Sequence, residues 1–298
     1  AFGGCTPEEP AVIDPPSEET GLMMPVAPEG ALDPTTPYAG SPLRGPDMTL
    51  TTGYEPEQFA TFQLGTEENP QLPFTLACYM EGDRVTGLVP AGVDLTAVVP
   101  LFQYTSGTVT CDGEPVISGV TALDLSRPRE MTLTEENGTA HTVTVDVQNL
   151  YTGLPSVSLV TLGMQAISSK TDLVPCTLYV GGGDSRCCPY AQEQTVTVSA
   201  RVRGRGNTSW SADKKGYSIN LDSAASLLDM PAARKWALVS NYEDKSLLRN
   251  VIAQYLSDEA EMDAVLDVRP VDLWLNGQYW GTYNLCERAS IHPAREDI

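Results

Sequence analysis

Hydrophobic and polar residues alternate in short stretches through residues 51–152, and turn residues separate these stretches. The clearest examples are residues 72–79, 94–99, 107–111, 131–134 and 141–147. A period of two places alternate side chains on one face of a strand, so each stretch is expected to be a strand with one buried side. Short strands about every ten residues predict a small antiparallel, immunoglobulin-like sandwich over 51–152.

Residues 153–298 combine strand patterns with one helical pattern. Strands are expected at residues 155–161, 176–180, 194–203, 217–221 and 235–240. Asn276-Gly277 lies between two further alternating stretches, and this pair is typical of a type I′ hairpin turn. Helical spacing follows Asp244, the expected N-cap, and it places on one face Leu248, Val251, Ile252, Tyr255 and Leu256. We therefore expect an α+β domain whose single helix packs this face into the core.

The first 50 residues differ from both of these parts. They contain ten prolines and eight acidic residues but a single arginine. Such a segment buries too little apolar surface to offset its chain entropy, so residues 1–50 are expected to be a disordered tether. The small residues before Cys5 are similar to the end of a bacterial lipoprotein signal, which predicts a lipid anchor at Cys5. The alternative is a chance cysteine.

The charge of the chain indicates the environment in which the protein works. The chain has 39 acidic and 18 basic residues, a net charge of −21, and no run of about 18 apolar residues that could span a membrane. This acidity argues against binding to nucleic acid or to anionic lipid, and it favours a secreted or cell-surface protein. Fourteen of the 18 basic residues follow residue 169, which supports a domain boundary near 150–155.

The cysteines give weaker evidence. Cys78 and Cys111 lie in strand-like stretches of one domain and could pair, and one disulfide is plausible among Cys176, Cys187 and Cys188. The cysteine spacing does not favour a zinc site.

A basic stretch at residues 201–215 stands out in this acidic protein. It holds five basic residues and one acid, Asp213, and it contains the sequence Gly204-Arg205-Gly206. Glycines let backbone amides approach a phosphate closely, so a loop between two strands that carries Arg205, Lys214 and Lys215 is expected to face an anion. The alternative is a solvated hairpin tip.

Seven segments of the second part resemble the CotH family, in order and in spacing. They are Arg-Gly-Asn-Thr-Ser-Trp at 205–210, Lys-Lys-Gly-Tyr at 214–217, the segments 227–231, 235–238, 241–250 and 275–281, and Glu287. CotH proteins are atypical protein kinases associated with spore coats and with secreted bacterial proteins. The resemblance covers about 155–298 and implies that 153–298 form an incomplete kinase-like, nucleotide-binding lobe.

The resemblance also implies a reaction. The protein would bind ATP and Mg²⁺ and transfer a phosphoryl group to Ser or Thr of a protein at the cell surface or outside the cell. Cell wall or glycan would be a further partner. Backbone near Gly206 and Asn207, with Arg205 and Ser209, would cradle phosphate. Lys214 or Lys215 would reach the α- and β-phosphates, and Glu287 or Asp244 would orient that lysine.

Two departures from the family limit these expectations. Gly216, Ser218 and Asn220 stand where the family has proline and basic residues, so the lysine that contacts nucleotide is left open. The family's catalytic residues would lie beyond Ile298, so the chain as given is expected to be inactive. The alternative is a non-catalytic adhesion or carbohydrate-binding protein with a sugar platform of Trp274, Tyr279, Trp280 and Tyr283.

Overall fold

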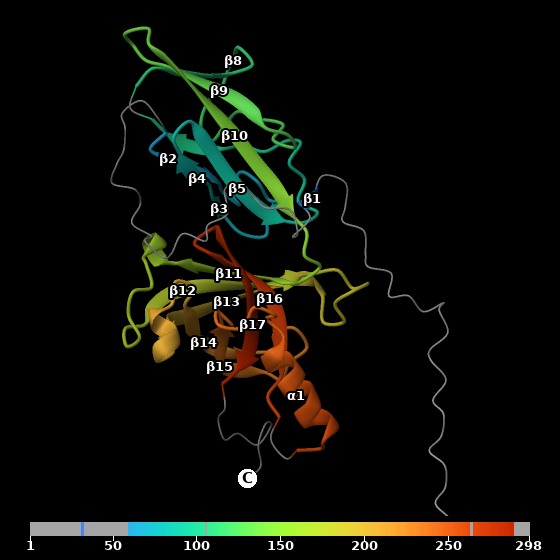
Figure 1. Ribbon diagram of the computed structural model, residues 1–298. Helices are drawn as coiled ribbons and strands as arrows, with labels where there is room; N and C mark the ends of the chain where they lie inside the picture. Colours follow the sequence, from blue (N-terminus) through green and yellow to red (C-terminus); the bar gives the residue numbers. More distant parts are fainter. Residues whose placement is uncertain (1–30, 33–58, 105, 263–264, 289–298) are drawn as a thin grey trace, which may run out of the picture.

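The protein consists of two β-rich units that lie one above the other (Figure 1). The structure is a computed structural model that describes residues 31–32, 59–104, 106–262 and 265–288. We call residues 59–150 the first unit and residues 156–287 the barrel. Within the described ranges there is one α-helix, α1 (Arg249–Glu259), besides two short 3₁₀ turns at Leu162–Met164 and Thr208–Ser211.

The first unit contains two sheets around an apolar core. The larger sheet has the order β4 (Tyr79–Glu81), β5 (Arg84–Pro90), β10 (Ala140–Leu150), β9 (Arg129–Thr134), β7 (Thr108–Cys111) and β8 (Glu114–Pro115), and β1 (Ala31–Leu32) pairs with β10. The smaller sheet has the order β3 (Leu76–Ala77), β2 (Thr61–Leu64) and β6 (Leu101–Gln103). β5 and β10 pair in parallel. The immunoglobulin-like assignment stays a prediction.

The barrel closes on itself through seven strands. Their order is β11 (Ser156–Thr161), β12 (Val174–Gly182), β13 (Gln192–Arg205), β14 (Gly216–Ala225), β15 (Ala233–Val239), β17 (Gln278–Glu287) and β16 (Val268–Leu275). Neighbours are antiparallel except at the closure, where β16 pairs in parallel with β11. The interior is filled by large side chains such as Tyr217, Trp236 and Tyr283, none of them more than 1% exposed.

The closed barrel overturns the expected α+β, kinase-like lobe for residues 153–298. Such a lobe needs an open sheet with a helix packed on one face, whereas pairing of β11 with β16 removes both sheet edges. The interior is packed by strand residues and the loops between them, so no core position is left for the helix. The described chain is therefore nearly all β.

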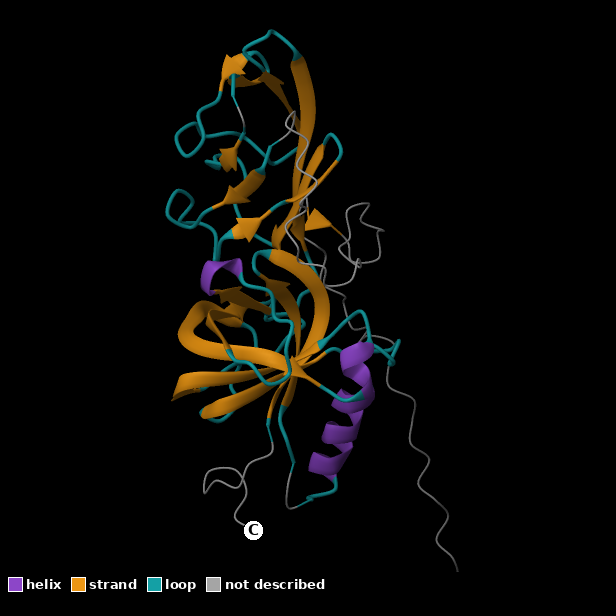
Figure 2. Ribbon diagram, turned by 90° about the vertical axis from the view of Figure 1, so that its left-hand side faces the viewer, coloured by secondary structure: helices purple, strands orange, loops and turns teal. Residues whose placement is uncertain are grey.

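Helix α1 is present where a helix was expected, but its predicted burial is wrong. The helix stands beside the barrel (Figure 2) and has no buried residue. Ile252 is 51% exposed and Tyr255 is 61% exposed, although both belong to the apolar face that was expected to pack into the core. The predicted N-cap is also wrong, because the N-cap of α1 is Leu248, which makes no side-chain cap bond. Asp244 lies further upstream, and its carboxylate accepts a hydrogen bond from the backbone N–H of Arg249 at 2.9 Å.

The two units meet in a small apolar contact. Trp274 of β16 packs against Phe74 of the first unit, with ring centroids 5.5 Å apart, and its indole N–H donates to the carbonyl of Leu88 at 3.0 Å. The Asn276-Gly277 turn of the predicted hairpin also touches the first unit, because a Cβ at Gly277 would lie 2.3 Å from the backbone nitrogen of Ala77. The hairpin itself is confirmed.

Two side chains of the linker at residues 151–154 form hydrogen bonds with carboxylates of the barrel. Tyr151 donates to the carboxylate of Asp184 at 2.8 Å, and Thr152 donates to the carboxylate of Asp272. These bonds connect the end of β10 to the body of the barrel. The linker is thus fixed to the barrel rather than suspended between the units.

Other expectations concern cysteines and the amino-terminal segment. The six described cysteines are free thiols, so the disulfides expected for Cys78 with Cys111 and among Cys176, Cys187 and Cys188 are not formed. Apart from Ala31–Leu32, the expected tether lies outside the described residues, as does Cys5. In the described ranges no helix combines the length and hydropathy needed to cross a membrane.

Candidate functional site

The basic side chains of β13 lie on the outside of the barrel. Val202 belongs to the interior core, and alternation along the strand therefore places Arg201, Arg203 and Arg205 on the opposite, outward face. This follows from sequence alone, because the three arginines are two residues apart. The backbone of β13 thus presents three guanidinium groups in one row.

The sheet register extends this row across four strands. Arg203 pairs with Ser218 of β14, Ser218 pairs with Ala237 of β15, and Ala237 pairs with Cys286 of β17. Directly paired residues share a face of a sheet. We define the basic face by its outward polar residues, which are Arg201, Arg203, Arg205, Ser218, Asn220, Lys235, Asn284 and Cys286.

Little negative charge opposes the basic face. Arg201 approaches the Asp222 carboxylate at 3.8 Å, and both side chains are exposed. Within the described part of the chain, Arg203, Arg205 and Lys235 form no ion pair. Burial raises the pKa of the Cys286 thiol, the nearby Arg205 guanidinium partly opposes that rise, and the Glu287 carboxylate adds to it. A positive face in a protein of net charge −21 is a local reversal of the overall field.

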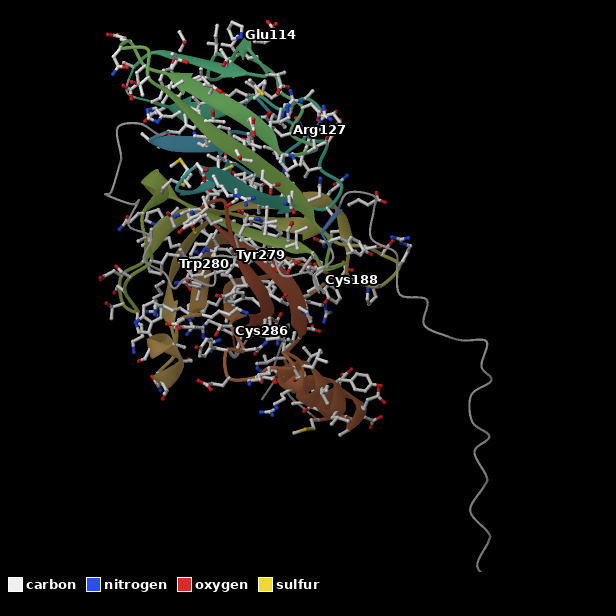
Figure 3. All side chains as sticks on the ribbon, turned by 45° about the horizontal axis from the view of Figure 1, so that its top comes forward. Glu114, Arg127, Cys188, Tyr279, Trp280 and Cys286 are labelled. Carbon is white, nitrogen blue, oxygen red and sulfur yellow. The ribbon has the colours of Figure 1, made fainter. Side chains whose placement is uncertain are left out.

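Several polar atoms on this face are buried without a hydrogen bond. They are Nε of Arg203, Oδ1 of Asn220 and Nδ2 of Asn284. Most buried polar groups in native proteins are paired, so a group of unpaired ones needs an explanation. Figure 3 shows Cys286, a member of the same face, at the end of the barrel nearest to helix α1.

Both lysines predicted to bind nucleotide donate to backbone carbonyls. Lys214 donates to the carbonyl of Thr282, and its ammonium lies 4.6 Å from the ring centroid of Tyr283. Lys215 donates to the carbonyls of Trp210 at 3.1 Å and Ala212 at 3.0 Å. Both side chains are half-buried and fasten the loop at residues 206–215 to itself and to the barrel.

The other predicted loop residues lie at the outer end of β13. Gly206 has a φ of +110°, a conformation that suits glycine, and the Lys170 ammonium donates to its carbonyl at 3.3 Å. Asn207 and Ser209 are exposed. Arg205, at the start of the same turn, is the predicted site residue that also belongs to the basic face.

Glu287 lies on the opposite side of the sheet from the basic face. It pairs with Trp236, a core residue, and is buried. The carboxylate whose charge acts on Lys214 is instead Asp272, a residue that the sequence reasoning missed. A single acid inside the apolar run of β16 was the available signal.

Asp272 is the centre of a buried polar cluster. It accepts hydrogen bonds from Tyr279 at 3.0 Å and from Thr282 at 3.1 Å, besides the bond from Thr152. Burial raises the pKa of Asp272, and these three bonds and the charge of Lys214 oppose that rise. Burial lowers the pKa of Lys214 to about 8, and Asp272 opposes that fall. This cluster is structural, since its donors and acceptors are paired.

The aromatic residues of the alternative sugar platform are mostly covered. Trp274, Trp280 and Tyr283 are buried, and Tyr279 is half-buried against Trp274. A sugar platform requires exposed ring faces, so the structure offers no platform at these residues.

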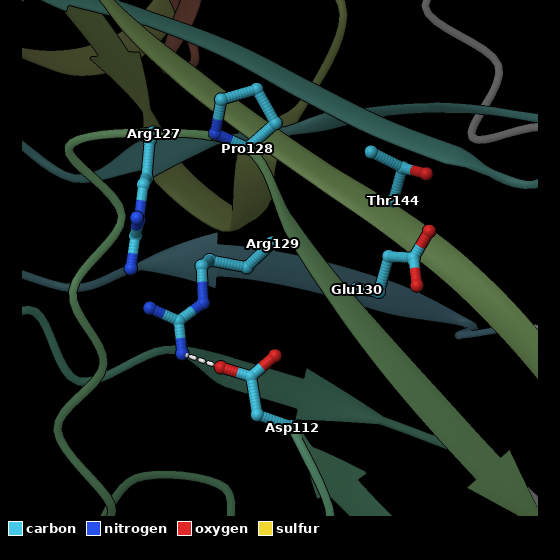
Figure 4. A pocket seen from close by; sticks show the side chains of 6 residues that line it. All are labelled: Asp112, Arg127, Pro128, Arg129, Glu130 and Thr144. Atoms are coloured by element: carbon cyan, nitrogen blue, oxygen red, sulfur yellow. Dashed lines mark hydrogen bonds and ion pairs between the residues drawn. The ribbon is translucent and has the colours of Figure 1, made fainter.

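A shallow polar pocket of about 420 Å³ lies in the first unit (Figure 4). It is lined by Asp112, Arg127, Pro128, Arg129, Glu130 and Thr144. Arg129 donates to the Asp112 carboxylate inside it. Acidic and basic side chains balance one another in this pocket. Its charge therefore indicates the charge of a ligand less clearly than the charge of the basic face does.

The basic face is poorly suited to a metal ion. In the described ranges, no group of three or more His, Cys, Asp or Glu side chains is placed to hold one. The face contains donors of hydrogen bonds and positive charge, which suit phosphate oxygens rather than Mg²⁺. Asp297 and Ile298 lie outside the described residues.

Comparison with known proteins gives one family match. Residues 202–297 match the family described as CotH kinase protein, which is roughly a third of the chain. No curated protein sequence matches the chain. The match begins inside β13 and contains β14 to β17, so these residues form a CotH-like segment that includes most of the basic face.

One solved structure that aligns with the chain is a Bacteroides thetaiotaomicron protein provisionally assigned as a glycoside hydrolase. The sequence identity is 18%, the TM-score is 0.22, and the alignment covers 58% of this chain and 51% of that one. This chain thus spans about half the length of that protein. A TM-score this low supports no conclusion about fold or function.

Proposed function

We propose that the basic face of the barrel binds the phosphates of ATP, and that the protein uses this site in phosphoryl transfer to Ser or Thr of a surface or extracellular protein. The observation that carries the proposal is the pair Arg203 and Arg205, two guanidinium groups without an ion pair on one outward face. The CotH-like segment supports it, because that segment contains both residues.

Physical chemistry favours phosphate as the partner of this face. Guanidinium groups form paired, charge-assisted hydrogen bonds with phosphate oxygens. Ser218, which pairs with Arg203, adds a neutral donor beside it, and Asn284 adds another on β17 of the same face. Phosphoryl transfer needs phosphates that are held in place and charge that is neutralised, and the described residues can supply both without covalent chemistry. Magnesium enters no step of this proposal.

The loop at residues 206–215 has a supporting part in this proposal. Its lysines hold carbonyls and so fix the loop beside Arg205, the last residue of β13. Direct contact of Lys214 or Lys215 with phosphate is therefore no part of the proposal. The cationic groups of the proposed site come from the strands.

The test is a calorimetric titration of the full chain with ATP, with and without Mg²⁺. A hydrogen bond to a charged group contributes roughly 1.5–3 kcal/mol, so Arg203→Ala and Arg205→Ala are each expected to weaken binding by about tenfold or more. Arg127→Ala is the matched control, because Arg127 is an exposed arginine of the first unit.

Two results would contradict the proposal. One is the absence of ATP binding to the unsubstituted chain. The other is binding that the double variant Arg203→Ala/Arg205→Ala leaves unchanged. Competition with a sulfated oligosaccharide is a further test. If the oligosaccharide displaces ATP at a concentration below the Kd of ATP, the face is instead assigned to an acidic glycan.

A further inference from the structure

Two buried asparagines lie at one end of the basic face, where β15 and β17 end their pairing. Asn284 of β17 pairs with Val239, the last residue of β15, and Asn241 follows two positions later. Asn284 is 1% exposed and Asn241 is 8% exposed. Both side-chain amides are therefore shielded from water, at the same end of the same two strands.

Each of these amides has a nitrogen without a hydrogen-bond partner. The Oδ1 of Asn241 accepts a hydrogen bond from Nδ2 of Asn250, in the first turn of α1, at 2.8 Å. Its own Nδ2 makes no hydrogen bond, and neither does Nδ2 of Asn284. The buried Asn69 is satisfied by contrast: it donates to the carbonyls of Gly65 and Val99 and accepts from the amide of Val99.

Arg205 provides positive charge on the same face as Asn284. Arg205 acts electrostatically on Cys286, which stands two residues from Asn284 on the same face of β17. Arg205 also packs against Gly216, whose Cβ position lies 3.1 Å from the carbonyl of Leu238 on β15. Arg205 therefore extends from β13 across β14 toward the end of β15, which leads to Asn241, and toward the part of β17 that carries Asn284.

One acid near these amides, Asp244, is already engaged. Asp244 accepts hydrogen bonds from the backbone amides of Ser246 and Arg249, and from the Ser246 hydroxyl. These bonds lower the pKa of Asp244, and they occupy the first N–H of α1. The start of α1 therefore fixes the positions of Asn250 and Asn241. The donors that remain free are the two amides and the guanidinium group.

We propose that Asn241, Asn284 and Arg205 form a phosphate subsite of the basic face, in which the two buried amides donate to the oxygens of one phosphate group. This inference rests on the proposed function and states where on the face the phosphate lies. A buried amide without an acceptor destabilises the folded protein. Two such amides beside a guanidinium group gain their missing acceptors when a phosphate binds.

The test uses Asn284→Leu in the full chain, because leucine has nearly the same size and removes the unsatisfied amide. The midpoint of thermal unfolding is measured alone and with ATP, pyrophosphate and inorganic phosphate. Without ligand, the midpoint of Asn284→Leu is expected to rise by roughly 2–4 °C. The upward shift that ATP or pyrophosphate causes in the unsubstituted chain is expected to disappear, with affinity at least tenfold lower.

The matched control is Asn69→Leu, which removes a fully bonded buried amide. It should lower the midpoint and leave the ligand-induced shift unchanged. Asn241→Gly is a second variant, because glycine accepts the φ of +49° at this position and lacks the amide. It should also abolish the ligand-induced shift.

The outcomes separate the subsite from the proposed function. If ATP stabilises Asn284→Leu and Asn241→Gly as much as the unsubstituted chain, the subsite is wrong and nucleotide binding stands. If pyrophosphate and phosphate shift the unsubstituted chain and neither variant, while ATP does not bind, the subsite stands without the nucleotide. If none of the three ligands shifts the unsubstituted chain, both proposals fail.

Discussion

At the residue scale, Lys214 shows how burial and charge compete at one amine. Its ammonium is half-buried, donates to the carbonyl of Thr282 and faces the buried Asp272. Burial disfavours the charged form and lowers the pKa of Lys214 to about 8, whereas Asp272 favours the charged form. Burial has the larger effect, so the folded protein holds this proton less tightly than the unfolded chain does.

This residue predicts a rise in stability on the alkaline side. Below pH 8, Lys214 is protonated in both states and the desolvation cost is fully present. Between about pH 8 and 10.5 the folded state releases the proton while the unfolded state retains it, so the free energy of unfolding increases with pH. Relative to Lys214→Met, the unsubstituted chain should gain about 2 kcal/mol across this range.

The measurement for Lys214 is urea unfolding of both proteins at steps between pH 7 and 10.5. The difference between the two free energies of unfolding isolates Lys214 from the tyrosines, which are common to both chains. Parallel pH profiles would show that burial of this amine has no energetic consequence.

At the element scale, the hairpin formed by β16 and β17 connects the barrel to the first unit. Gly277 occupies its turn with a φ of +78°, and a Cβ there would lie 2.3 Å from the Ala77 nitrogen and 2.7 Å from the Thr75 oxygen. Two separate constraints therefore act on one glycine. The first is the backbone conformation of the turn, and the second is the close approach of the two units.

A pair of glycine substitutions separates these constraints. Gly138, in the turn between β9 and β10, has a φ of +86° and open space at its Cβ position. Gly138→Ala should therefore cost about 1 kcal/mol of stability through backbone strain alone. Gly277→Ala should cost about 2–4 kcal/mol, because the clash with Ala77 adds to that strain. Urea unfolding measures both, and equal costs would show that the contact yields without penalty.

The Asn276-Gly277 hairpin was predictable from sequence, while the closure of the barrel was not. A type I′ turn is specified by its own two residues, so the pattern contains the information. Pairing of β11 with β16 joins Ser156 to Asp272, and no local pattern specifies partners so far apart in the chain. Periodicity likewise identified the apolar face of α1, but it did not show whether another element covers that face.

The candidate site, like the fold, was predictable from the sequence only in part. The spacing of Arg201, Arg203 and Arg205 places them on one face of a strand, so this part of the basic face is predictable from the sequence. The carbonyl partners of Lys214 and Lys215 come from folding of the loop and from β17. The sequence shows that these two side chains are positively charged, but only the tertiary structure shows which groups they contact.

At the scale of the whole molecule, the first unit and the barrel should behave as one cooperative body. Trp274 is 1% exposed in the contact between them and both packs against Phe74 and donates to the Leu88 carbonyl. Linker bonds from Tyr151 to Asp184 and from Thr152 to Asp272 add to this contact. A single thermal unfolding transition is therefore expected for the unsubstituted chain.

Trp274→Ala tests this coupling. Removal of a buried tryptophan costs roughly 3–5 kcal/mol, and here the loss falls on the contact between the units rather than on either core. Calorimetry should then resolve two transitions, one for each unit, because each retains its own apolar core. Limited proteolysis should also begin to cut at residues 151–154.

Trp274→Phe, which keeps an aromatic ring and loses the bond to Leu88, should lower the midpoint while preserving one transition. A single transition in Trp274→Ala would mean that the linker bonds and the close approach of Gly277 to Ala77 are together enough to make the two units unfold as one.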